Sequence, residues 1–159
     1  KAGAYKNLPL IPKAIFMVIV IDTREQHPYV FSTQVVRRKL DAGDYSIEGF
    51  ETVAAIERKE LNDYVQTVIY QKERFKKELA KLAEYRLKAI VVEASMADIL
   101  AGRYEGHISP QSVIGATVGI HLAYGIPIHF CCNRQIALHF TETLLTKFHE
   151  RHTGERLNQ

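Results

Sequence analysis

The stretch of sequence that decides the fold begins at Gly43-Asp44 and closes with the run Val53-Ala54-Ala55-Ile56-Glu57-Arg58-Lys59. The apolar half of this run predicts a buried β-strand, and successive side chains on a strand point to opposite faces of the sheet. Glu57 and Lys59 are therefore expected on one face and Arg58 on the other. This alternation places a carboxylate and an ammonium group together at the carboxyl end of the strand.

Asp44 is expected to join these two side chains through a hairpin. Residues 45–47 and 52–56 would pair as antiparallel strands across a turn at Glu48-Gly49, and Gly43 supplies backbone freedom beside the site. Two carboxylates form a hard, oxygen-rich site that suits Mg²⁺. A lysine next to them can orient water or neutralise charge that develops on a phosphate. These groups are the smallest set that supports metal-assisted phosphodiester hydrolysis.

A second set of charged residues follows the apolar run Ala14–Ile21, which predicts a strand buried on both faces. Asp22-Thr23-Arg24-Glu25 comes directly after it, at the carboxyl end where sites form in open α/β sheets. A solvated loop is the competing interpretation. Two acids that flank an arginine, taken together with Asp44 and Glu57, favour a functional role for Asp22.

Composition and charge set wide limits on function. The chain has 159 residues, of which 47% are hydrophobic, so we expect one domain with a real core. A formal net charge of +3 tolerates a polyanionic partner but does not require one. No apolar run approaches the roughly 20 residues of a membrane span. Cys131 and Cys132 are adjacent and lack zinc-site spacing, which indicates a reducing, intracellular compartment such as cytoplasm, nucleoid or nucleus.

Hydrophobic periodicity predicts the remaining elements. Further strands are expected at residues 34–40, 87–93 and 126–131, and helices at residues 60–70, 73–85, 96–101, 109–124 and 134–151. Residues 1–13 are expected to be a tether and residues 153–159 a frayed tail, which leaves one domain at residues 14–152. This order of elements predicts an α/β fold in which helices flank a central mixed sheet on both faces.

Several charged residues have more than one interpretation. The cluster Arg37-Arg38-Lys39 is either a patch that faces phosphate or a solvated edge of the sheet. Asn62 or Asp63 would cap the helix at residues 60–70, and Asp63 would otherwise support the site. The next helix has lysines interleaved with glutamates, which predicts a mainly solvated face; these lysines are Lys72, Lys76, Lys77 and Lys81.

Two features near the carboxyl end also need interpretation. The helix at residues 109–124 is apolar almost all round, which predicts deep packing or a subunit contact. Gly115 and Gly119 in this helix favour close packing against another helix. His149 and His152 fall at the predicted frayed end of the last helix, so we expect them on the surface.

The combined motifs resemble the nuclease domain of the XPF family of structure-selective endonucleases. The resemblance rests on Asp22-Thr23-Arg24-Glu25, then Gly43-Asp44-Tyr45, then Glu57-Arg58-Lys59 with Asp63, which is similar to the family pattern GD…ERKxxxD. It covers roughly Ile15–Glu150, and the strand that ends in Glu93 also resembles its family counterpart. The resemblance implies a restriction-endonuclease-like fold of the PD-(D/E)xK type.

The resemblance also implies roles for individual residues. Asp22, Asp44 and Glu57 would bind Mg²⁺ or Mn²⁺, and the carbonyl oxygen of Arg58 would complete the ligand shell. Lys59 would position the attacking water or stabilise the transition state, and Glu25 would belong to the same catalytic set. The residues expected to support the site or to contact phosphate are Arg24, Glu25, Arg58, Asp63 and, on the DNA backbone, Arg74.

The function that the resemblance implies is metal-dependent cleavage of branched, forked or flapped DNA during repair or recombination. Two alternatives stay open: a non-catalytic DNA-binding or dimerisation subunit of the same fold, and a nuclease that acts on RNA. Inactive family members typically lose the Glu57-Arg58-Lys59 triplet, which is present here.

Family proteins usually add a tandem helix-hairpin-helix domain, and nothing after Arg151 is long enough for one. We therefore expect an isolated nuclease domain, either part of a longer chain or a stand-alone nuclease of bacterial or phage type. Nuclease domains of the family also pair through their own helices. A homodimer or heterodimer through residues 113–122 and the last helix is thus expected, although core packing explains the same apolar pattern.

Overall fold

The computed structural model of the protein describes residues 16–156, and the predicted tether at residues 1–13 lies outside them. The strands are β1 Val18–Ile21, β2 Gln34–Arg37, β3 Tyr45–Ile47, β4 Ala54–Lys59, β5 Leu87–Val92 and β6 Ile128–Phe130. The helices are α1 Leu61–Tyr70, α2 Lys72–Ala83, α3 Met96–Leu100, α4 Pro110–Tyr124 and α5 Arg134–Arg156. The strands form one six-stranded sheet in the order β2-β1-β3-β4-β5-β6.

The sheet is mixed. Strand β1 runs parallel to β2 and antiparallel to β3, and β3 runs antiparallel to β4. Strands β4, β5 and β6 are parallel to one another. The predicted hairpin between β3 and β4 is thus confirmed, and so is the α/β fold with a central mixed sheet.

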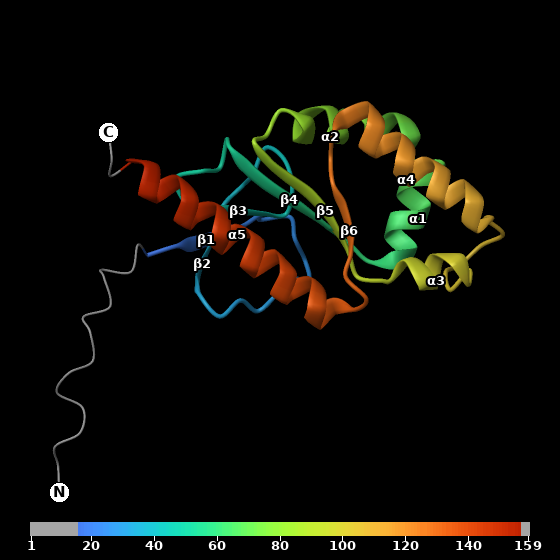
Figure 1. Ribbon diagram of the computed structural model, residues 1–159, viewed down its shortest axis with the longest axis horizontal. Helices are drawn as coiled ribbons and strands as arrows, with labels where there is room; N and C mark the ends of the chain where they lie inside the picture. Colours follow the sequence, from blue (N-terminus) through green and yellow to red (C-terminus); the bar gives the residue numbers. More distant parts are fainter. Residues whose placement is uncertain (1–15, 157–159) are drawn as a thin grey trace, which may run out of the picture.

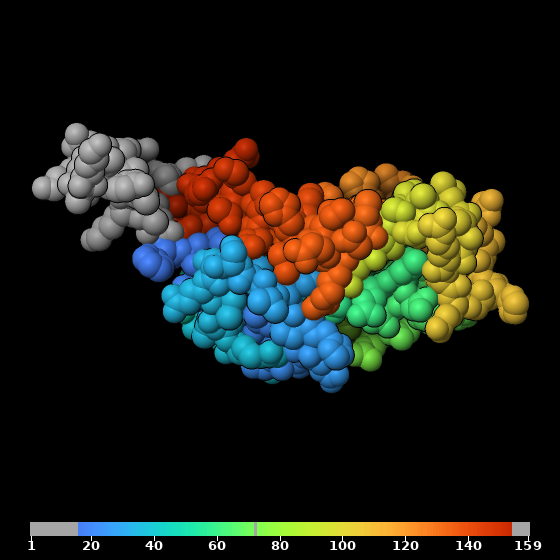
Figure 2. Space-filling model, turned by 90° about the horizontal axis from the view of Figure 1, so that it is seen from below, coloured from blue at the N-terminus to red at the C-terminus, as the bar shows by residue number. Residues whose placement is uncertain are grey.

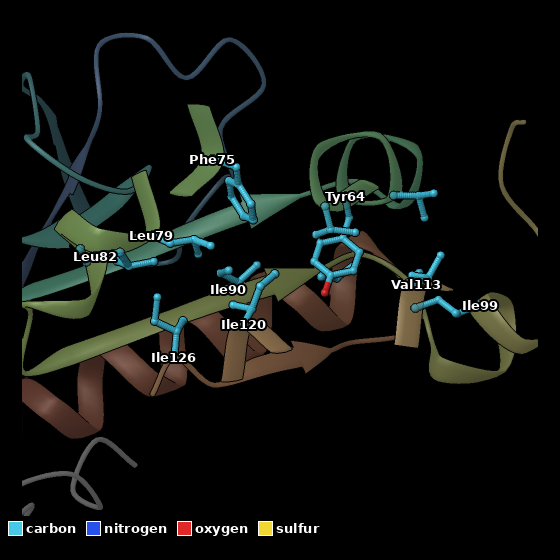
Figure 3. Close-up of a cluster of buried hydrophobic side chains, with 14 of the residues drawn as sticks. Tyr64, Phe75, Leu79, Leu82, Ile90, Ile99, Val113, Ile120 and Ile126 are labelled. Atoms are coloured by element: carbon cyan, nitrogen blue, oxygen red, sulfur yellow. The ribbon is translucent and has the colours of Figure 1, made fainter. Parts of the chain in front are cut away.

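Helices cover both faces of this sheet (Figure 1), and each face of the sheet has its own apolar core beneath the helices. Helices α1, α2 and α4 pack over Ala55 and Ile90 on one face, where Tyr64, Phe75 and Ile120 fill the space (Figure 3). Helix α5 packs on the other face, over a second core that includes Ile56 and Val91. Because side chains alternate along β4, Glu57 and Lys59 share the face of Ala55, and Arg58 shares the face of Ile56.

The tight approach of β3 to β4 requires glycine at the start of the hairpin. Gly43 has a φ of 74°, and a Cβ atom on it would lie 2.9 Å from the carbonyl oxygen of Ile56. A side chain at this position would therefore be strained and would also collide with the neighbouring backbone. The close contact explains why Gly43 precedes Asp44.

The carboxyl-terminal region departs from the sequence-based predictions. Helix α5 continues to Arg156, beyond the predicted end at Arg151. The prediction that His149 lies on the surface is wrong, because this side chain is buried and its ring lies 5.8 Å from that of Phe50. His152 is half-buried, since it stacks on Phe148 with 3.9 Å between ring centroids. Apolar packing against the β3–β4 turn thus extends the helix.

The helices differ in how their first turns are capped. Ser109 caps α4 ahead of Pro110, and Asn133 accepts a hydrogen bond from the backbone N–H of Ile136 at the start of α5. The predicted side-chain cap of α1 is wrong, because its cap position is Glu60 and no side chain caps the helix there.

Helix α4 is also less deeply packed than its sequence predicts. Val113 and Ile120 are its buried residues, whereas Leu122 is 77% exposed. Figure 2 shows the α3–α4 end of the molecule (yellow to light orange) far from the carboxyl-terminal end of α5 (red).

None of the helices in the described part of the chain has the length and apolar character that a membrane span needs.

Candidate active-site cleft

Three strand ends bring the predicted acids close together. The backbone N–H of Asp22, directly after β1, donates to the carbonyl oxygen of Asp44 at 2.8 Å. The backbone N–H of Asp44, directly before β3, donates to the carbonyl oxygen of Ile56 at 2.8 Å. Asp22, Asp44 and Glu57 therefore follow one another across neighbouring strands at the same edge of the fold.

These acids open onto a cavity of about 370 Å³ between the sheet and helix α2. Asp22, Arg24, Asp44, Glu57 and Lys59 line the sheet side of this cleft. The predicted convergence of three acids and one lysine on a single surface is thus a feature of the structure. A cleft of this size is in the range of ligand sites in proteins.

Asp44 and Glu57 form the electrostatic centre of the cleft. Burial raises the pKa of the Asp44 carboxyl well above its ordinary value, and the negative charge of Glu57 raises it further. Burial also raises the pKa of Glu57. The backbone N–H of Arg58 donates to Oδ2 of Asp44 at 2.7 Å, which fixes this carboxylate but does not cancel its repulsion from Glu57. The pair is therefore poised to accept a compensating positive charge.

Lys59 supplies part of that charge. Its Nζ atom lies 3.3 Å from Oε1 of Glu57 and 5.9 Å from the centre of the Phe75 ring. Burial works against the charged form of Lys59, yet the neighbouring carboxylates of Glu57 and Asp44 hold its pKa above the ordinary value. Lys59 is thus a protonated hydrogen-bond donor inside the cleft at neutral pH.

Asp22 is held differently from the other two acids. Its Oδ2 atom accepts from Nε of Arg24 at 2.7 Å, and its Oδ1 atom accepts from the backbone N–H of Leu40 at 2.8 Å. Burial opposes the charged form, but these hydrogen bonds hold the pKa of Asp22 below its ordinary value. Arg24 also donates to the carbonyl oxygen of Leu40 at 2.8 Å. Asp22 and Arg24 together tie the end of β1 to the loop before β3.

The donor set fits a divalent cation at Asp44 and Glu57. Two desolvated carboxylates that raise one another's energy are suited to a hard cation such as Mg²⁺, which supplies the missing positive charge. Among residues 16–156, however, no group of three or more Asp, Glu, His or Cys side chains is already arranged to hold a metal ion. Asp22 differs from the other two acids because Nε of Arg24 already lies 2.7 Å from its Oδ2 atom.

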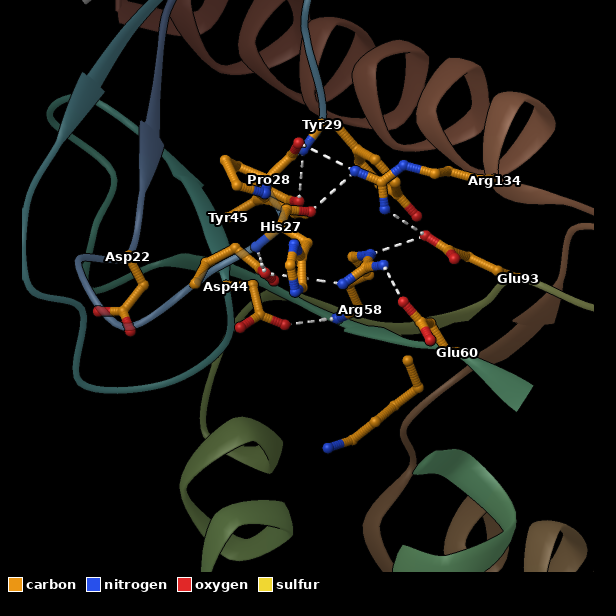
Figure 4. A network of polar contacts seen from close by, with 12 residues as sticks. Asp22, His27, Pro28, Tyr29, Asp44, Tyr45, Arg58, Glu60, Glu93 and Arg134 are labelled. Carbon is orange, nitrogen blue, oxygen red and sulfur yellow. Dashed lines mark hydrogen bonds and ion pairs between the residues drawn. The ribbon is translucent and has the colours of Figure 1, made fainter. Parts of the chain in front are cut away.

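Arg58 points away from the cleft, as the strand alternation predicts, and organises the opposite face of the sheet (Figure 4). Its guanidinium group lies 2.7 Å from Glu93 Oε1, 3.0 Å from Glu60 Oε1 and 3.6 Å from Glu25 Oε1. The side chains of Arg58, Glu25 and Glu93 are each only 8% exposed. Glu25 therefore does not line the cleft, and Arg58 supports the site from behind rather than facing a phosphate in it.

Arg134 is a member of this cluster that the sequence did not indicate. Its guanidinium donates to Glu93 at 3.1 Å and to the carbonyl oxygens of His27 and Pro28 at 2.8 and 3.0 Å. Its Cζ atom also lies 5.0 Å from the centre of the Tyr29 ring. Arg134 begins α5, so this contact fastens that helix to the loop after β1. Its position directly after the Asn133 cap is the only local signal in the sequence.

The other predicted site residues are not all in the cleft. Asp63 is exposed in the first turn of α1 and is not among the side chains that line the cavity. Arg74 does line it, from α2, and pairs with Glu78 at 3.4 Å. Lys77 and Lys81 are exposed, which confirms the prediction of a solvated face for these two α2 lysines, and they also line the cavity opposite the acids.

A family model for the ERCC4 domain matches residues 21–144. The chain belongs to the ERCC4 domain family. The match begins at the last residue of β1 and continues into α5, so it includes every element that contributes to the cleft. The resemblance to the XPF nuclease domain is thus confirmed for this ERCC4 domain.

Solved structures show the same fold. This ERCC4 domain is similar to XPF from Aeropyrum pernix, with a TM-score of 0.68 and 24% identity over 89% of this chain and 70% of that one. It is also similar to XPF from Aeropyrum pernix in complex with DNA, with a TM-score of 0.66 and 24% identity over 84% of this chain and 66% of that one. The chain therefore spans about two thirds of the length of these relatives. None of the curated proteins matches it.

The unfavourable charge at Asp44 makes a prediction about stability. Asp44→Asn is expected to raise the melting temperature of the metal-free ERCC4 domain at pH 7.5 and to leave it unchanged at about pH 3. The pKa of Asp44 is higher in the folded than in the unfolded protein, so the folded protein keeps a proton on Asp44 at pH values where the unfolded protein has lost it. The wild type therefore loses stability as pH rises from the unfolded-state pKa to the folded-state pKa. A difference of 1 kcal/mol corresponds to about 2–4 °C in a domain of this size.

The measurement is thermal unfolding in EDTA at both pH values, with Glu150→Gln as a control at an exposed carboxylate that pairs with Lys147. Added Mg²⁺ should stabilise the wild type more than Asp44→Asn, because a ligand stabilises the form that binds it. A lower melting temperature of Asp44→Asn at neutral pH would show that the carboxylate is not under electrostatic strain.

Proposed function

We propose that the protein is a Mg²⁺- or Mn²⁺-dependent endonuclease that hydrolyses phosphodiester bonds in branched, forked or flapped DNA. The observation that carries the proposal is the position of Lys59 Nζ, 3.3 Å from Glu57 in a cleft that Asp44 and Asp22 also line. Membership of the ERCC4 domain family supports the same assignment. Cleavage of such intermediates would serve DNA repair or recombination.

The residues of the cleft suit attack of water on a phosphate diester. The water oxygen forms a bond to phosphorus and loses a proton to solvent, one bridging P–O bond breaks, and the leaving oxygen takes up a proton from solvent. Lys59 donates a hydrogen bond to the attacking water or to a non-bridging oxygen, where negative charge develops. A bound Mg²⁺ or Mn²⁺ held by Asp44 and Glu57 would supply Lewis acidity at a phosphoryl oxygen. Asp22 and Arg24 hold the β1 end of the site in place.

DNA is the proposed substrate because a structural relative, XPF from Aeropyrum pernix, was solved in complex with DNA. The formal net charge of +3 is compatible with a polyanionic partner. Arg24 and Arg74, which lie on opposite walls of the cleft, offer positive charge to the backbone.

The test is a cleavage panel on labelled fork, 3′-flap, 5′-flap, nicked and single-stranded DNA, with Mg²⁺, with Mn²⁺ and with EDTA. Cutting of at least one branched substrate that EDTA abolishes is the expected result. A matched RNA set in the same panel distinguishes a DNA nuclease from an RNA nuclease. A protein that binds Mn²⁺ in a calorimetric titration but leaves every substrate intact would overturn the proposal.

We also propose that two copies of this domain pair through α4. Gly115, Val118, Gly119 and Leu122 recur at helical spacing on one side of this helix. Val118 is 50% exposed and Leu122 is 77% exposed, and a Cβ atom on either glycine would meet nothing within 4 Å. The close packing that we predicted for the two glycines is thus not made within the described residues. A second copy of the same surface would cover it, because small residues let two helices approach closely.

The double variant Val118→Asp/Leu122→Asp is expected to be monomeric at concentrations where the wild type dimerises. Charges on this surface would have to be buried without partners in a dimer, which is costly. Light scattering coupled to size exclusion, over a range of protein concentrations, measures the change. The control is Phe16→Asp/Val30→Asp, which places the same charge at two side chains that are 83% and 87% exposed away from α4. A wild-type protein that stays monomeric at about 100 times the concentration used in the cleavage panel would contradict the pairing.

A further inference from the structure

Arg134 stands at a position where its charge does not favour the helix that it begins. It is the first residue of α5, and a cation in the first turn of a helix is repelled by the positive end of the helix dipole. Its side chain is 44% exposed, yet three hydrogen bonds hold its guanidinium group. These contacts, and not the stability of α5, explain a positive charge at this position.

One half of the Arg134 guanidinium is anchored, and the other half is directed at Glu93 (Figure 4). The Nη2 atom donates to the carbonyl oxygens of His27 and Pro28, while the Cζ atom lies 5.0 Å from the centre of the Tyr29 ring. The Nη1 atom donates to Oε1 of Glu93 at 3.1 Å. Because the guanidinium is planar and rigid, the anchored half fixes the direction from which Nη1 meets the carboxylate.

Glu93 connects Arg134 to the strand that carries the cleft residues. The same Oε1 atom accepts from Nε of Arg58 at 2.7 Å, and the backbone N–H of Glu93 donates to the carbonyl oxygen of Lys59 at 2.9 Å. The backbone N–H of Arg58 in turn donates to Oδ2 of Asp44 at 2.7 Å. A continuous series of contacts therefore extends from the start of α5 to one of the two acids at the centre of the cleft.

Arg134 also completes the charge balance of this cluster. The side chains of Glu25 and Glu93 are each 8% exposed, and the Arg58 guanidinium faces both. Arg134 is the second cation on Glu93, so Arg58 does not neutralise two buried carboxylates alone. Loss of Arg134 is therefore expected to shift the Arg58 side chain within the cluster, together with the backbone N–H that holds Asp44.

We propose that Arg134 is a positioning residue for the cleft and acts on it from the opposite face of the sheet. Through Glu93, it holds the carboxylate of Asp44 beside that of Glu57. The effect on cleavage rests on the proposed nuclease function, whereas the effect on cation binding does not. Residues behind a metal site commonly contribute about 10- to 100-fold to metal affinity or activity. Arg134 acts through two other residues, so we expect the lower end of this range.

The test applies two measurements to Arg134→Gln: a calorimetric titration with Mn²⁺ alone, and single-turnover cleavage of a labelled flap over a range of protein concentrations. We expect Mn²⁺ affinity and the maximal rate each to fall by about 10-fold. The protein concentration that gives half the maximal rate should stay unchanged, because Arg134 is not among the side chains that line the cavity.

The sign of the Mn²⁺ result separates positioning from charge. If the acids did not move, removal of a nearby cation would raise the affinity for Mn²⁺ and not lower it. The control Arg151→Gln removes the same charge at an exposed position of α5 and should match the wild type in both measurements. Thermal unfolding checks that each variant is folded at the assay temperature.

A second background shows whether Arg134 acts through Glu93. In Glu93→Gln the carboxylate that Arg134 contacts has lost its charge, so adding Arg134→Gln should lower neither the Mn²⁺ affinity nor the rate further. Losses that multiply in the double variant would overturn the inference. An Arg134→Gln protein that matches Arg151→Gln in both measurements would overturn it as well.

The outcomes separate this inference from the nuclease function. A wild type that binds Mn²⁺ but cuts nothing overturns the nuclease proposal, and the Mn²⁺ titrations alone then uphold or overturn the role of Arg134. A wild type that cuts the flap as fast as Arg134→Gln, with equal Mn²⁺ affinity, upholds the nuclease proposal and overturns the positioning role.

Discussion

Lys59→Ala is expected to lower the rate of DNA cleavage by about 10²- to 10³-fold, the usual cost of removing one donor that stabilises charge in a transition state. The ammonium group of Lys59 is held inside the cleft by Glu57, 3.3 Å away, and the carboxylates around it keep it protonated. Single-turnover cleavage of a flap substrate measures the rate. Binding of the same substrate should change little, because one cation among several contributes only a small part of the affinity.

Two controls make the Lys59 result specific. Lys147→Ala removes an exposed lysine whose partner is Glu150, and its cleavage rate should match the wild type. Lys59→Met keeps most of the side-chain volume beside Phe75 and should be as inactive as Lys59→Ala, which assigns the loss to charge and not to packing. Full activity of either Lys59 variant would remove this lysine from the chemistry.

The sequence predicted the parts of the site that depend on local pattern. Alternation along β4 separates Glu57 and Lys59 from Arg58, and a glycine-led hairpin returns Asp44 to their side. Both follow from strand geometry, which acts over a few residues and is therefore visible in sequence. The contribution of Asp22 also followed, because a buried strand places the next residue at its carboxyl end.

The parts that the sequence missed depend on contacts between distant segments. Arg134 meets Glu93 and the carbonyl of His27 only because α5 crosses the sheet at that edge. Lys77 and Lys81 are exposed, as predicted, but their position opposite the acids depends on how α2 packs over the sheet. His149 was assigned to the surface for the same reason, since its partner Phe50 is about 100 residues away in the chain.

Arg58→Ala is expected to destabilise the fold by about 3–5 kcal/mol, because removal of one partner leaves buried opposite charges uncompensated. Glu25 and Glu93 are each 8% exposed and both face the Arg58 guanidinium. Arg134 still contacts Glu93 at 3.1 Å, which places the expected loss toward the lower end of this range. Urea denaturation of wild type and variant measures the difference.

The role of Arg58 can be separated from that of an ordinary ion pair. Arg103→Ala breaks a pair with Asp98 of similar length, 2.8 Å, in which the arginine is 67% exposed, and should destabilise the fold much less than Arg58→Ala. The double variant Arg58→Met/Glu93→Gln should recover part of the loss, since it removes the orphaned charge together with its partner. The backbone N–H of Arg58 also holds Asp44, so a shift of β4 in Arg58→Ala would reach the cleft on the opposite face. If Arg58→Ala and Arg103→Ala lower the free energy of unfolding equally, the cluster around Arg58 acts as an ordinary surface feature and does not support the site.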